Sequence, residues 1–189
     1  TLKNISLNVK AGEILGIAGV AGNGQEELLN LISGEDTSAK ETVLFANKSV
    51  GNLTPEKRRI LGLGFVPEER LGRGAVPDMS LQDNGLLTGY QGDLTNNGII
   101  NTSKVKAFAQ NIIEKFNVKA AGIHAQAKSL SGGNLQKYII GREILQNPKL
   151  LVCSHPTWGV DIGAAILIRH ELIKLRDEGC AVLVVSEDI

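Results

Sequence analysis

The sequence lacks the features that mark several classes of protein. It has only two cysteines, Cys153 and Cys180, and both lie within apolar runs. Their spacing fits no metal site, and we expect them to be reduced core residues of a cytosolic protein. No apolar run approaches the roughly 18 residues of a membrane-spanning helix, and no signal peptide opens the chain. These absences argue against a disulfide scaffold and a cysteine-bound metal, and they predict no transmembrane segment.

The chain also lacks an excess of charge of either sign. Its 20 basic and 20 acidic residues balance, so no strong field would draw it to nucleic acid or to a membrane surface. We therefore expect no nucleic-acid partner. The 189 residues suit one domain, or one domain with a subdomain, and 42% of them are apolar, enough for a sizeable core. The first residue is Thr1 rather than Met, and we interpret the chain as part of a longer polypeptide.

Strand patterns alternate with helix patterns over most of the chain. Apolar or alternating runs predict strands over residues 5–9, 14–18, 43–45, 63–66, 150–153 and 181–185. Helical spacing and capping signals predict helices over residues 25–32, 55–62, 81–88 and 162–178, around residues 105–116, and after Gly133. This alternation favours an α/β protein with a mostly parallel sheet. Residues 71–145 carry helical patterns without strand signals, so we interpret them as a helical subdomain inserted into a core of residues 1–70 and 146–189.

The segment SLSGGNLQ, residues 129–136, is the most informative stretch. A serine and two glycines directly before a helix present a hydroxyl and bare backbone N–H groups at the positive end of the helix dipole, an arrangement that suits an anion. A flexible turn without a ligand is the alternative interpretation of such a short motif.

A second glycine-rich loop follows the strand over residues 14–18 and opens a helix, which is the context of a phosphate-binding P-loop. The candidate nucleotide-binding residues are Gly19, Val20, Ala21, Gly22, Asn23, Gly24, Gln25 and Glu26. A working loop has Lys and then Ser or Thr where this chain has Gln25 and Glu26. A charge-assisted hydrogen bond is worth about 1.5–3 kcal/mol, so its loss predicts nucleotide binding weakened about tenfold or more. A turn without a ligand stays open as an alternative, whereas a dinucleotide-binding loop would need a third glycine.

Together with SLSGGN, three strings carry a family resemblance: GVAGNGQEEL at residues 19–28, FVPEERLGRG at 65–74 and HPTWGVDIGA at 155–164. The chain resembles the nucleotide-binding domain of ABC transporters, and more narrowly the second, degenerate domain of fused ATPases that serve simple-sugar or nucleoside importers. The resemblance implies an ABC-type P-loop NTPase core with a mostly parallel sheet, antiparallel N-terminal strands and an inserted helical subdomain. It also implies ATP and Mg²⁺ as cofactors and a location at the cytoplasmic face of the cell membrane.

The same resemblance implies several partners. They are a second ABC ATPase domain, N-terminal in the same polypeptide, membrane permease subunits and, indirectly, a substrate-binding protein. The mixed charges of Glu69, Arg70 and Arg73 fall beside the expected permease contact, although a solvated surface explains them equally well. Trp158 either packs at the domain interface or caps the strand layer.

Several catalytic positions of the family are altered here. Ser154 stands where the family has the aspartate that orients Mg²⁺, and His155 stands where it has the glutamate that polarises the attacking water. As neighbours on one strand, these two side chains should point to opposite faces and make a poor catalytic pair. Glu68 falls at the position of the glutamine that senses the γ-phosphate, and Glu187 at that of the switch histidine.

Two elements that the family lends to a partner's ATP are intact. They are the signature, Leu130, Ser131, Gly132, Gly133 and Asn134, and the D-loop aspartate, Asp161. We therefore expect this domain to complete a working site on its partner, while its own pocket binds nucleotide weakly and hydrolyses it slowly or not at all. An active ATPase with a divergent site and a docking domain that binds no nucleotide are the alternatives. An ABC-type ATPase of DNA repair is disfavoured, because heptad arms and cysteine pairs are absent between the loop and the signature.

Overall fold

The computed structural model describes residues 2–20, 22–90 and 92–187. Its strands are β1 (Ile14–Ala18), β2 (Leu44–Phe45), β3 (Lys48–Ser49), β4 (Leu63–Val66), β5 (Thr95–Asn96), β6 (Ile99–Ile100), β7 (Leu150–Ser154) and β8 (Ala181–Ser186). Its α-helices are α1 (Gln25–Ser33), α2 (Pro55–Leu61), α3 (Leu81–Gly89), α4 (Thr102–Lys115), α5 (Gly132–Ile144) and α6 (Ile162–Asp177). Two 3₁₀ turns span Lys40–Thr42 and Ala127–Ser129.

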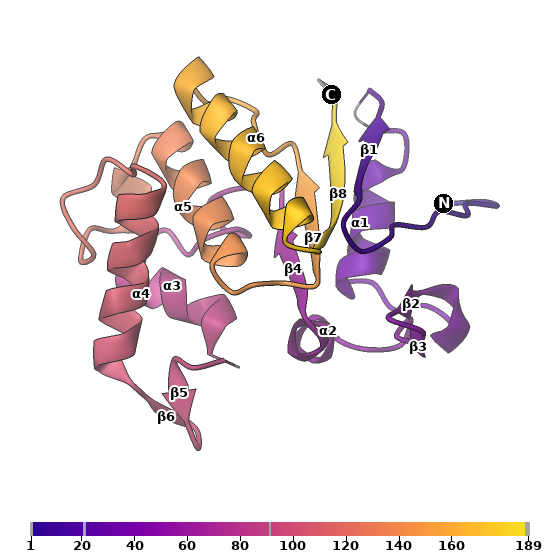
Figure 1. Ribbon diagram of the computed structural model, residues 1–189, viewed down its shortest axis with the longest axis horizontal. Coiled ribbons are helices and arrows are strands. Elements are labelled where there is room, and N and C mark those ends of the chain that lie inside the picture. Colours follow the sequence, from indigo (N-terminus) through magenta and orange to yellow (C-terminus); the bar gives the residue numbers. More distant parts are fainter. Residues whose placement is uncertain (1, 21, 91, 188–189) are drawn as a thin grey trace.

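The main sheet has four strands in the order β1-β8-β7-β4, and every neighbouring pair is parallel (Figure 1). The prediction of an α/β fold with a mostly parallel sheet is therefore confirmed. Among the described residues, two short hairpins, β2–β3 and β5–β6, pair antiparallel, and an isolated antiparallel bridge joins Ser80 to Gln126. Because all four sheet strands run the same way, their carboxyl ends share one edge, where the loops after them meet.

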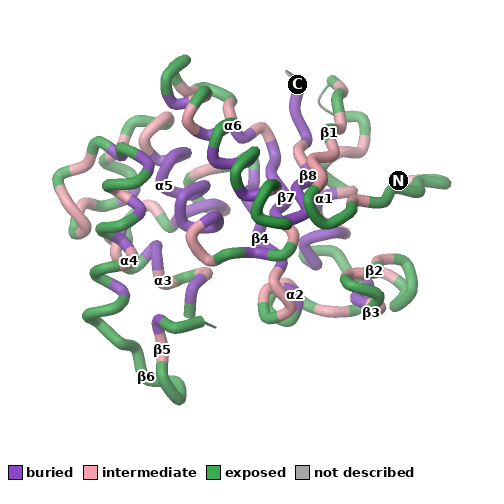
Figure 2. Tube along the Cα trace, in the orientation of Figure 1, coloured by how far each residue is buried: buried purple, intermediate pink, exposed green. Residues whose placement is uncertain are grey.

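Helices cover both faces of the sheet, since the strand side chains alternate between two cores. On one face, α1 packs Leu29 and Ile32 against Phe65, Val152 and Leu183. On the other face, α5 and α6 pack against a larger cluster. That cluster includes Val66, Leu151, Cys153, Val182, Ile139, Ile140, Ile168 and Leu172. Burial is concentrated where α5 lies against β4 and β7 (Figure 2).

Local sequence signals fix several helix ends. Gly34 ends α1 in the left-handed conformation, at φ 90°, and its N–H donates to the Asn30 carbonyl. Ser80 caps α3, because its hydroxyl accepts a hydrogen bond from the Asp83 N–H at 3.1 Å. These helices begin and end close to where the sequence predicts.

Two predictions of secondary structure were wrong. No strand forms over residues 5–9, where Ile5 is 52% and Leu7 38% exposed, because no described strand pairs with this segment and an unpaired strand leaves its backbone groups unbonded. Conversely, the predicted helical region contains the β5–β6 hairpin. Its turn residues Asn97 and Gly98 have φ values of 49° and 78°, the Asn-Gly geometry that closes a two-residue hairpin.

Within the described residues, none of the helices has both the length and the hydropathy needed to cross a lipid bilayer.

Candidate functional site

The candidate site residues gather at the carboxyl edge of the sheet. The register pairs Ala18 of β1 with Ser186 of β8, and Ser154 of β7 with Val185. The glycine loop, Glu68, His155 and Glu187 therefore follow strand ends at one edge. Of these, the structure brings His155 and Glu68 into a direct contact, with 3.9 Å between Nε2 and Oε2.

The glycine loop is closed by the side chain of Gln25. The Gln25 amide oxygen accepts a hydrogen bond from the Asn23 N–H at 2.9 Å, and its amide nitrogen donates to the Val20 carbonyl at 3.0 Å. The Asn23 side chain donates to the same carbonyl at 2.9 Å. A backbone N–H that a phosphate would use is therefore occupied by the loop's own side chain. Ala21, also predicted to bind nucleotide, lies outside the described residues.

The Gln25 side chain occupies the space beside Gly19. A Cβ atom at Gly19 would lie 2.7 Å from the Gln25 amide nitrogen, so a larger residue there would require Gln25 to shift. Gly22 and Gly24 adopt left-handed backbone, with φ values of 87° and 98°, and Gly24 precedes α1 without a capping side chain. The glycines thus let the loop curl around Gln25.

Glu26 turns toward an arginine. Its carboxylate lies 3.5 Å from the Arg73 guanidinium, which also bonds to Asn30 and Glu35 and sits 5.7 Å from the centre of the Phe65 ring. Glu26 and Glu27 are both in the first turn of α1, where negative charge complements the helix dipole. The N-terminus of α1 therefore already carries negative charge where a P-loop helix would meet phosphate.

The end of β7 provides no carboxylate. Ser154 is the last residue of the strand and is 4% exposed. His155 has already left the strand, at φ 45°, and its N–H donates to the Val185 carbonyl at 2.8 Å. The expectation that the two residues continue one strand was therefore wrong at His155. A left-handed histidine is uncommon, and here the bond to β8 holds it in place.

The residues at this edge do not fit the magnesium site of the family. Mg²⁺ prefers oxygen ligands in octahedral geometry and is usually held by one or two carboxylates plus phosphate oxygens. Instead, β7 ends with the buried hydroxyl of Ser154 and is followed by the imidazole of His155. The carboxylate of Glu26 is paired with Arg73. Across the described residues, no three His, Cys, Asp or Glu side chains form a group that could hold a metal ion.

The signature, in contrast, forms an exposed turn at the N-terminus of α5. Ser131 directly precedes α5, and Ser131 and Gly132 are exposed. The first N–H groups of an α-helix have no partner within the helix, so those of Gly132 and Gly133 are available to a ligand. The Asn134 amide nitrogen donates to the Ser131 hydroxyl at 2.9 Å, and its oxygen accepts from the Lys119 N–H at 2.9 Å. Asn134 thereby orients the hydroxyl of Ser131.

Asp161 caps α6. Its carboxylate accepts a hydrogen bond from the Ala164 N–H at 2.9 Å, and this bond, together with the charge of Lys137, lowers the pKa of Asp161. The preceding Val160 lies beside the signature, since a Cβ atom at Gly133 would be 3.6 Å from its Cα. The signature and the D-loop therefore form one continuous surface.

Two further polar residues at this surface were not predicted. Arg70 and Gln136 hydrogen-bond to each other, with 3.0 Å between Nε and Oε1. Gln136 is 1% exposed and also donates to the Pro156 carbonyl at 3.2 Å. Arg70 was interpreted as part of a mixed charge cluster, at the permease contact or on a solvated surface, and Gln136 only as the last residue of SLSGGNLQ, so the packing alone brings the two together.

The sequence is similar to those of known proteins. The family model described as "ABC transporter" matches residues 2–158. The nucleoside import ATP-binding protein NupA of Lactococcus lactis subsp. cremoris (strain MG1363) is 43% identical over 189 residues, covering 100% of this chain and 37% of NupA. The glucose import ATP-binding protein TsgD13 of Haloferax volcanii is 39% identical over 193 residues, covering 100% of this chain and 35% of TsgD13. The chain thus spans little more than a third of the length of these curated relatives.

Among solved structures, a similar fold is that of the ATP-binding cassette MJ0796, in a dimeric, post-hydrolysis state bound to ADP and Pi. The TM-score is 0.84 at 26% identity, over 99% of this chain and 80% of that one. This similarity covers the sheet and the helices on both of its faces.

Proposed function

Because the chain belongs to the ABC transporter family, we propose that it is the ATP-binding part of an ATPase that drives the import of nucleosides or sugars. The names of its relatives, which include nucleoside and glucose import proteins, support this substrate class. An importer ATPase of this kind works with membrane permease subunits at the cytoplasmic face of the membrane, and through them with a substrate-binding protein.

We further propose that the chain works beside a second ABC ATPase domain in the same polypeptide. The relatives are more than twice as long as this chain, which leaves room for such a domain. Residues 71–145 would form the helical subdomain that contacts the permease, and residues 1–70 and 146–189 the core. The dimeric state of MJ0796 supports pairing of two cassettes as the working arrangement.

The domain's own site is proposed to bind Mg-ATP weakly and to hydrolyse it slowly or not at all. The single observation that carries this proposal is Gln25, whose side chain bonds to both Val20 and Asn23 inside the loop. The pairing of Glu26 with Arg73 and the absence of a carboxylate after β7 point the same way. ATP would have to break the internal bonds of Gln25 without gaining a lysine's charge in return.

The signature is proposed to serve the partner's ATP. Ser131 and Gly132 are exposed at the N-terminus of α5, where the first N–H groups of the helix have no partner within it, a geometry that suits the γ-phosphate of a nucleotide held elsewhere. Asp161 would contribute from the adjoining D-loop.

A second candidate is an active ATPase with a divergent site. The observation that favours it is the 3.9 Å contact between His155 and Glu68, which places an imidazole beside a carboxylate at the carboxyl edge of the sheet. In this case His155 would take the role of the glutamate that activates water.

Nucleotide binding and turnover by this chain separate the candidates. We expect millimolar or weaker affinity for a fluorescent ATP analogue in the presence of Mg²⁺, and no turnover above background. Turnover on the order of 1 per second or faster, abolished in His155→Ala, would establish the divergent catalyst instead.

The proposed contact of the signature with the partner's ATP is tested in the full-length ATPase with its permease. Ser131→Arg places a long side chain in the signature turn, and we expect it to abolish ATP turnover. Ser129→Arg, two residues earlier and also exposed, is the matched control and should retain turnover. Full activity of Ser131→Arg would contradict this role of the signature.

A further inference from the structure

The segment after β4 forms a closed turn, here called the Arg70 turn, over residues 67–75. Its backbone is bonded to itself, because the Gly74 N–H donates to the Glu69 carbonyl at 2.9 Å and the Ala75 N–H donates to the Arg70 carbonyl at 2.7 Å. Gly74 has no room for a side chain, since a Cβ atom there would lie 2.9 Å from both the Arg70 carbonyl and Ile139 of α5. The turn is therefore fixed against α5.

Arg70 extends from this turn to two other segments. Its Nε donates to the Gln136 side chain on α5 at 3.0 Å, and its Nη2 donates to the Trp158 carbonyl just before the D-loop. Gln136 itself donates to the Pro156 carbonyl at 3.2 Å. Arg70 and Gln136 thus form a bridge from the signature helix to the segment that leads from β7 to Asp161.

Glycines at both ends make room for the guanidinium group. A Cβ atom at Gly132, the first residue of α5, would lie 2.9 Å from Nη1 of Arg70. A Cβ atom at Gly159, where φ is 60°, would lie 3.2 Å from Nη2. At Gly159 the left-handed backbone itself favours glycine, and at Gly132 a side chain would require the guanidinium group to shift, so both glycines are compatible with the position of Arg70.

The charge of Arg70 lies at the positive end of the α5 dipole. A cation is unfavourable at a helix N-terminus, and burial lowers the pKa of Arg70, although a guanidinium stays protonated in proteins. The hydrogen bonds to Gln136 and Trp158 hold the charge there.

We propose that Arg70 is a positioning residue that locks the signature turn, Ser131–Asn134, to the D-loop, Gly159–Asp161, so that both reach the partner's ATP in one fixed arrangement. This inference rests on the proposed function, because it concerns the signature as lent to a partner. Arg70 acts through Gly132 and Trp158 and is not assigned a contact with the nucleotide.

The test compares Arg70→Gln and Arg70→Lys with the wild type in the full-length ATPase with its permease. Since a displacement of about 1 Å can cost about a hundredfold in rate, we expect Arg70→Gln to lower kcat between tenfold and a hundredfold, with a smaller change in KM for ATP. Lysine retains the charge but not the forked geometry, so Arg70→Lys should recover little of the loss. Arg169→Gln, on the exposed side of α6, is the matched control and should leave kcat unchanged.

Hydrogen exchange provides a second readout that a general loss of stability would not imitate. We expect exchange to quicken in Arg70→Gln at residues 130–134 and 157–161, with little change in β7 and β8. If Arg70→Gln does not fold, the same comparison is made with Arg70→Lys. Unchanged kcat and unchanged local exchange, alongside an inactive Ser131→Arg, would overturn the role of Arg70 and leave the proposed function intact. Full activity of Ser131→Arg would instead remove the proposed function on which this inference rests.

Discussion

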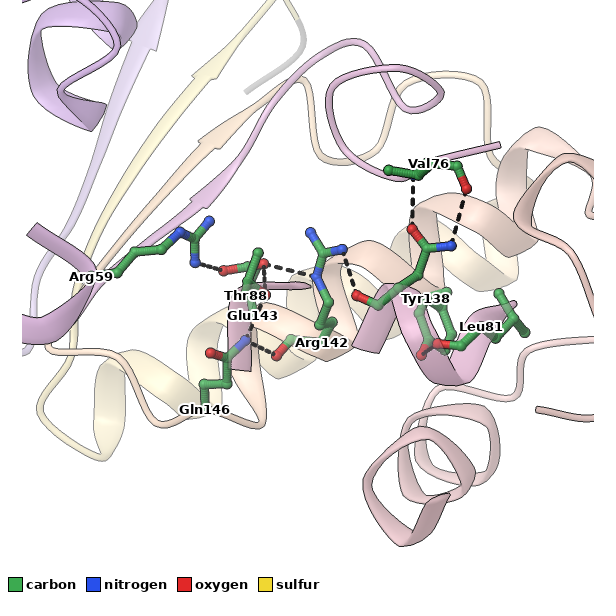
Figure 3. A network of polar contacts seen from close by, with 9 residues as sticks. Arg59, Val76, Leu81, Thr88, Tyr138, Arg142, Glu143 and Gln146 are labelled. Atoms are coloured by element: carbon green, nitrogen blue, oxygen red, sulfur yellow. Dashed lines mark hydrogen bonds and ion pairs between the residues drawn. The ribbon is translucent and has the colours of Figure 1, made fainter. Parts of the chain in front are cut away.

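Arg59 on α2, which is partly exposed, forms an ion pair with the buried Glu143 on α5, with 2.7 Å between Nη1 and Oε2 (Figure 3). Arg142 approaches the other carboxylate oxygen at 2.9 Å, and the Thr88 hydroxyl donates to that oxygen at 2.9 Å. Gln146 in turn donates to Thr88. The carboxylate of Glu143 is 1% exposed and joins α2, α3 and α5, so it links the sheet region to the helix that begins with the signature.

Glu143→Gln should destabilise the protein strongly. The neutral amide leaves the buried charge of Arg142 and the partly exposed charge of Arg59 without their counter-ion, and breaking a buried ion pair such as Arg142–Glu143 from one side costs about 3–5 kcal/mol. Urea unfolding, monitored by circular dichroism, measures the change in the free energy of unfolding. Glu178→Gln is the matched control, because its 4.0 Å contact with Lys174 is exposed and should contribute less than about 1 kcal/mol. Equal losses in the two variants would contradict the role of the network.

The contribution of Glu143 should also depend on pH. Burial raises the pKa of Glu143, but the charges of Arg59 and Arg142 and the hydrogen bonds from Arg59 and Thr88 outweigh it and hold the pKa below its ordinary value. Because the pKa is lower in the folded state, the stabilisation is complete above the unfolded pKa of about 4.3 and is lost as the pH falls through the folded value. The difference in unfolding free energy between the wild type and Glu143→Gln should therefore be constant from pH 7 to 5 and shrink below pH 4. A difference that grows on acidification would refute this assignment.

Gln25→Lys should strengthen nucleotide binding at the domain's own loop. Lysine restores a charge-assisted bond worth about 1.5–3 kcal/mol, so we expect the Kd for a fluorescent ATP analogue to fall about tenfold or more. Gln25→Leu serves as the control, because it frees the Asn23 N–H without adding a charge, while the Val20 carbonyl keeps its hydrogen bond from the Asn23 side chain. If Gln25→Leu gains less affinity for the analogue than Gln25→Lys, that smaller gain measures how much the internal hydrogen bonds of Gln25 by themselves weaken nucleotide binding. If neither variant binds more tightly than the wild type, Gln25 does not limit binding.

The two cysteines should resist alkylation in the folded protein. Cys153 and Cys180 are both buried, at 0% and 4% exposure. Burial raises the pKa of Cys153 well above its ordinary value and that of Cys180 to about 11, so little thiolate forms at pH 8. Mass spectrometry after treatment with iodoacetamide at pH 8 should find both thiols unmodified in the native protein and modified in urea. Rapid native labelling of either residue would indicate local opening of β7 or of the start of β8.

The sequence patterns located most regular elements correctly where local signals agreed with packing. The apolar run at residues 14–18 became β1, and Gly34 ended α1 as predicted. The strand predicted over residues 5–9 did not form. Alternation of apolar and polar residues is not sufficient, because a strand also needs a partner strand to supply its hydrogen bonds. The β5–β6 hairpin was missed because its strands are two residues each, too short for a periodic signal, although Asn97-Gly98 indicated the turn.

The sequence alone determined which chemistry is available at the candidate site: glycines at the loop and the signature, a hydroxyl and an imidazole after β7, and glutamine in place of lysine. Only the tertiary structure decided where these groups point. Gln25 bonds within its own loop, Glu26 turns to Arg73, and Arg70 reaches from a turn after β4 to Trp158, 88 residues further along the chain. Such contacts depend on side-chain rotamers and on the space left by distant glycines, and neither is encoded in the spacing of residues along the sequence.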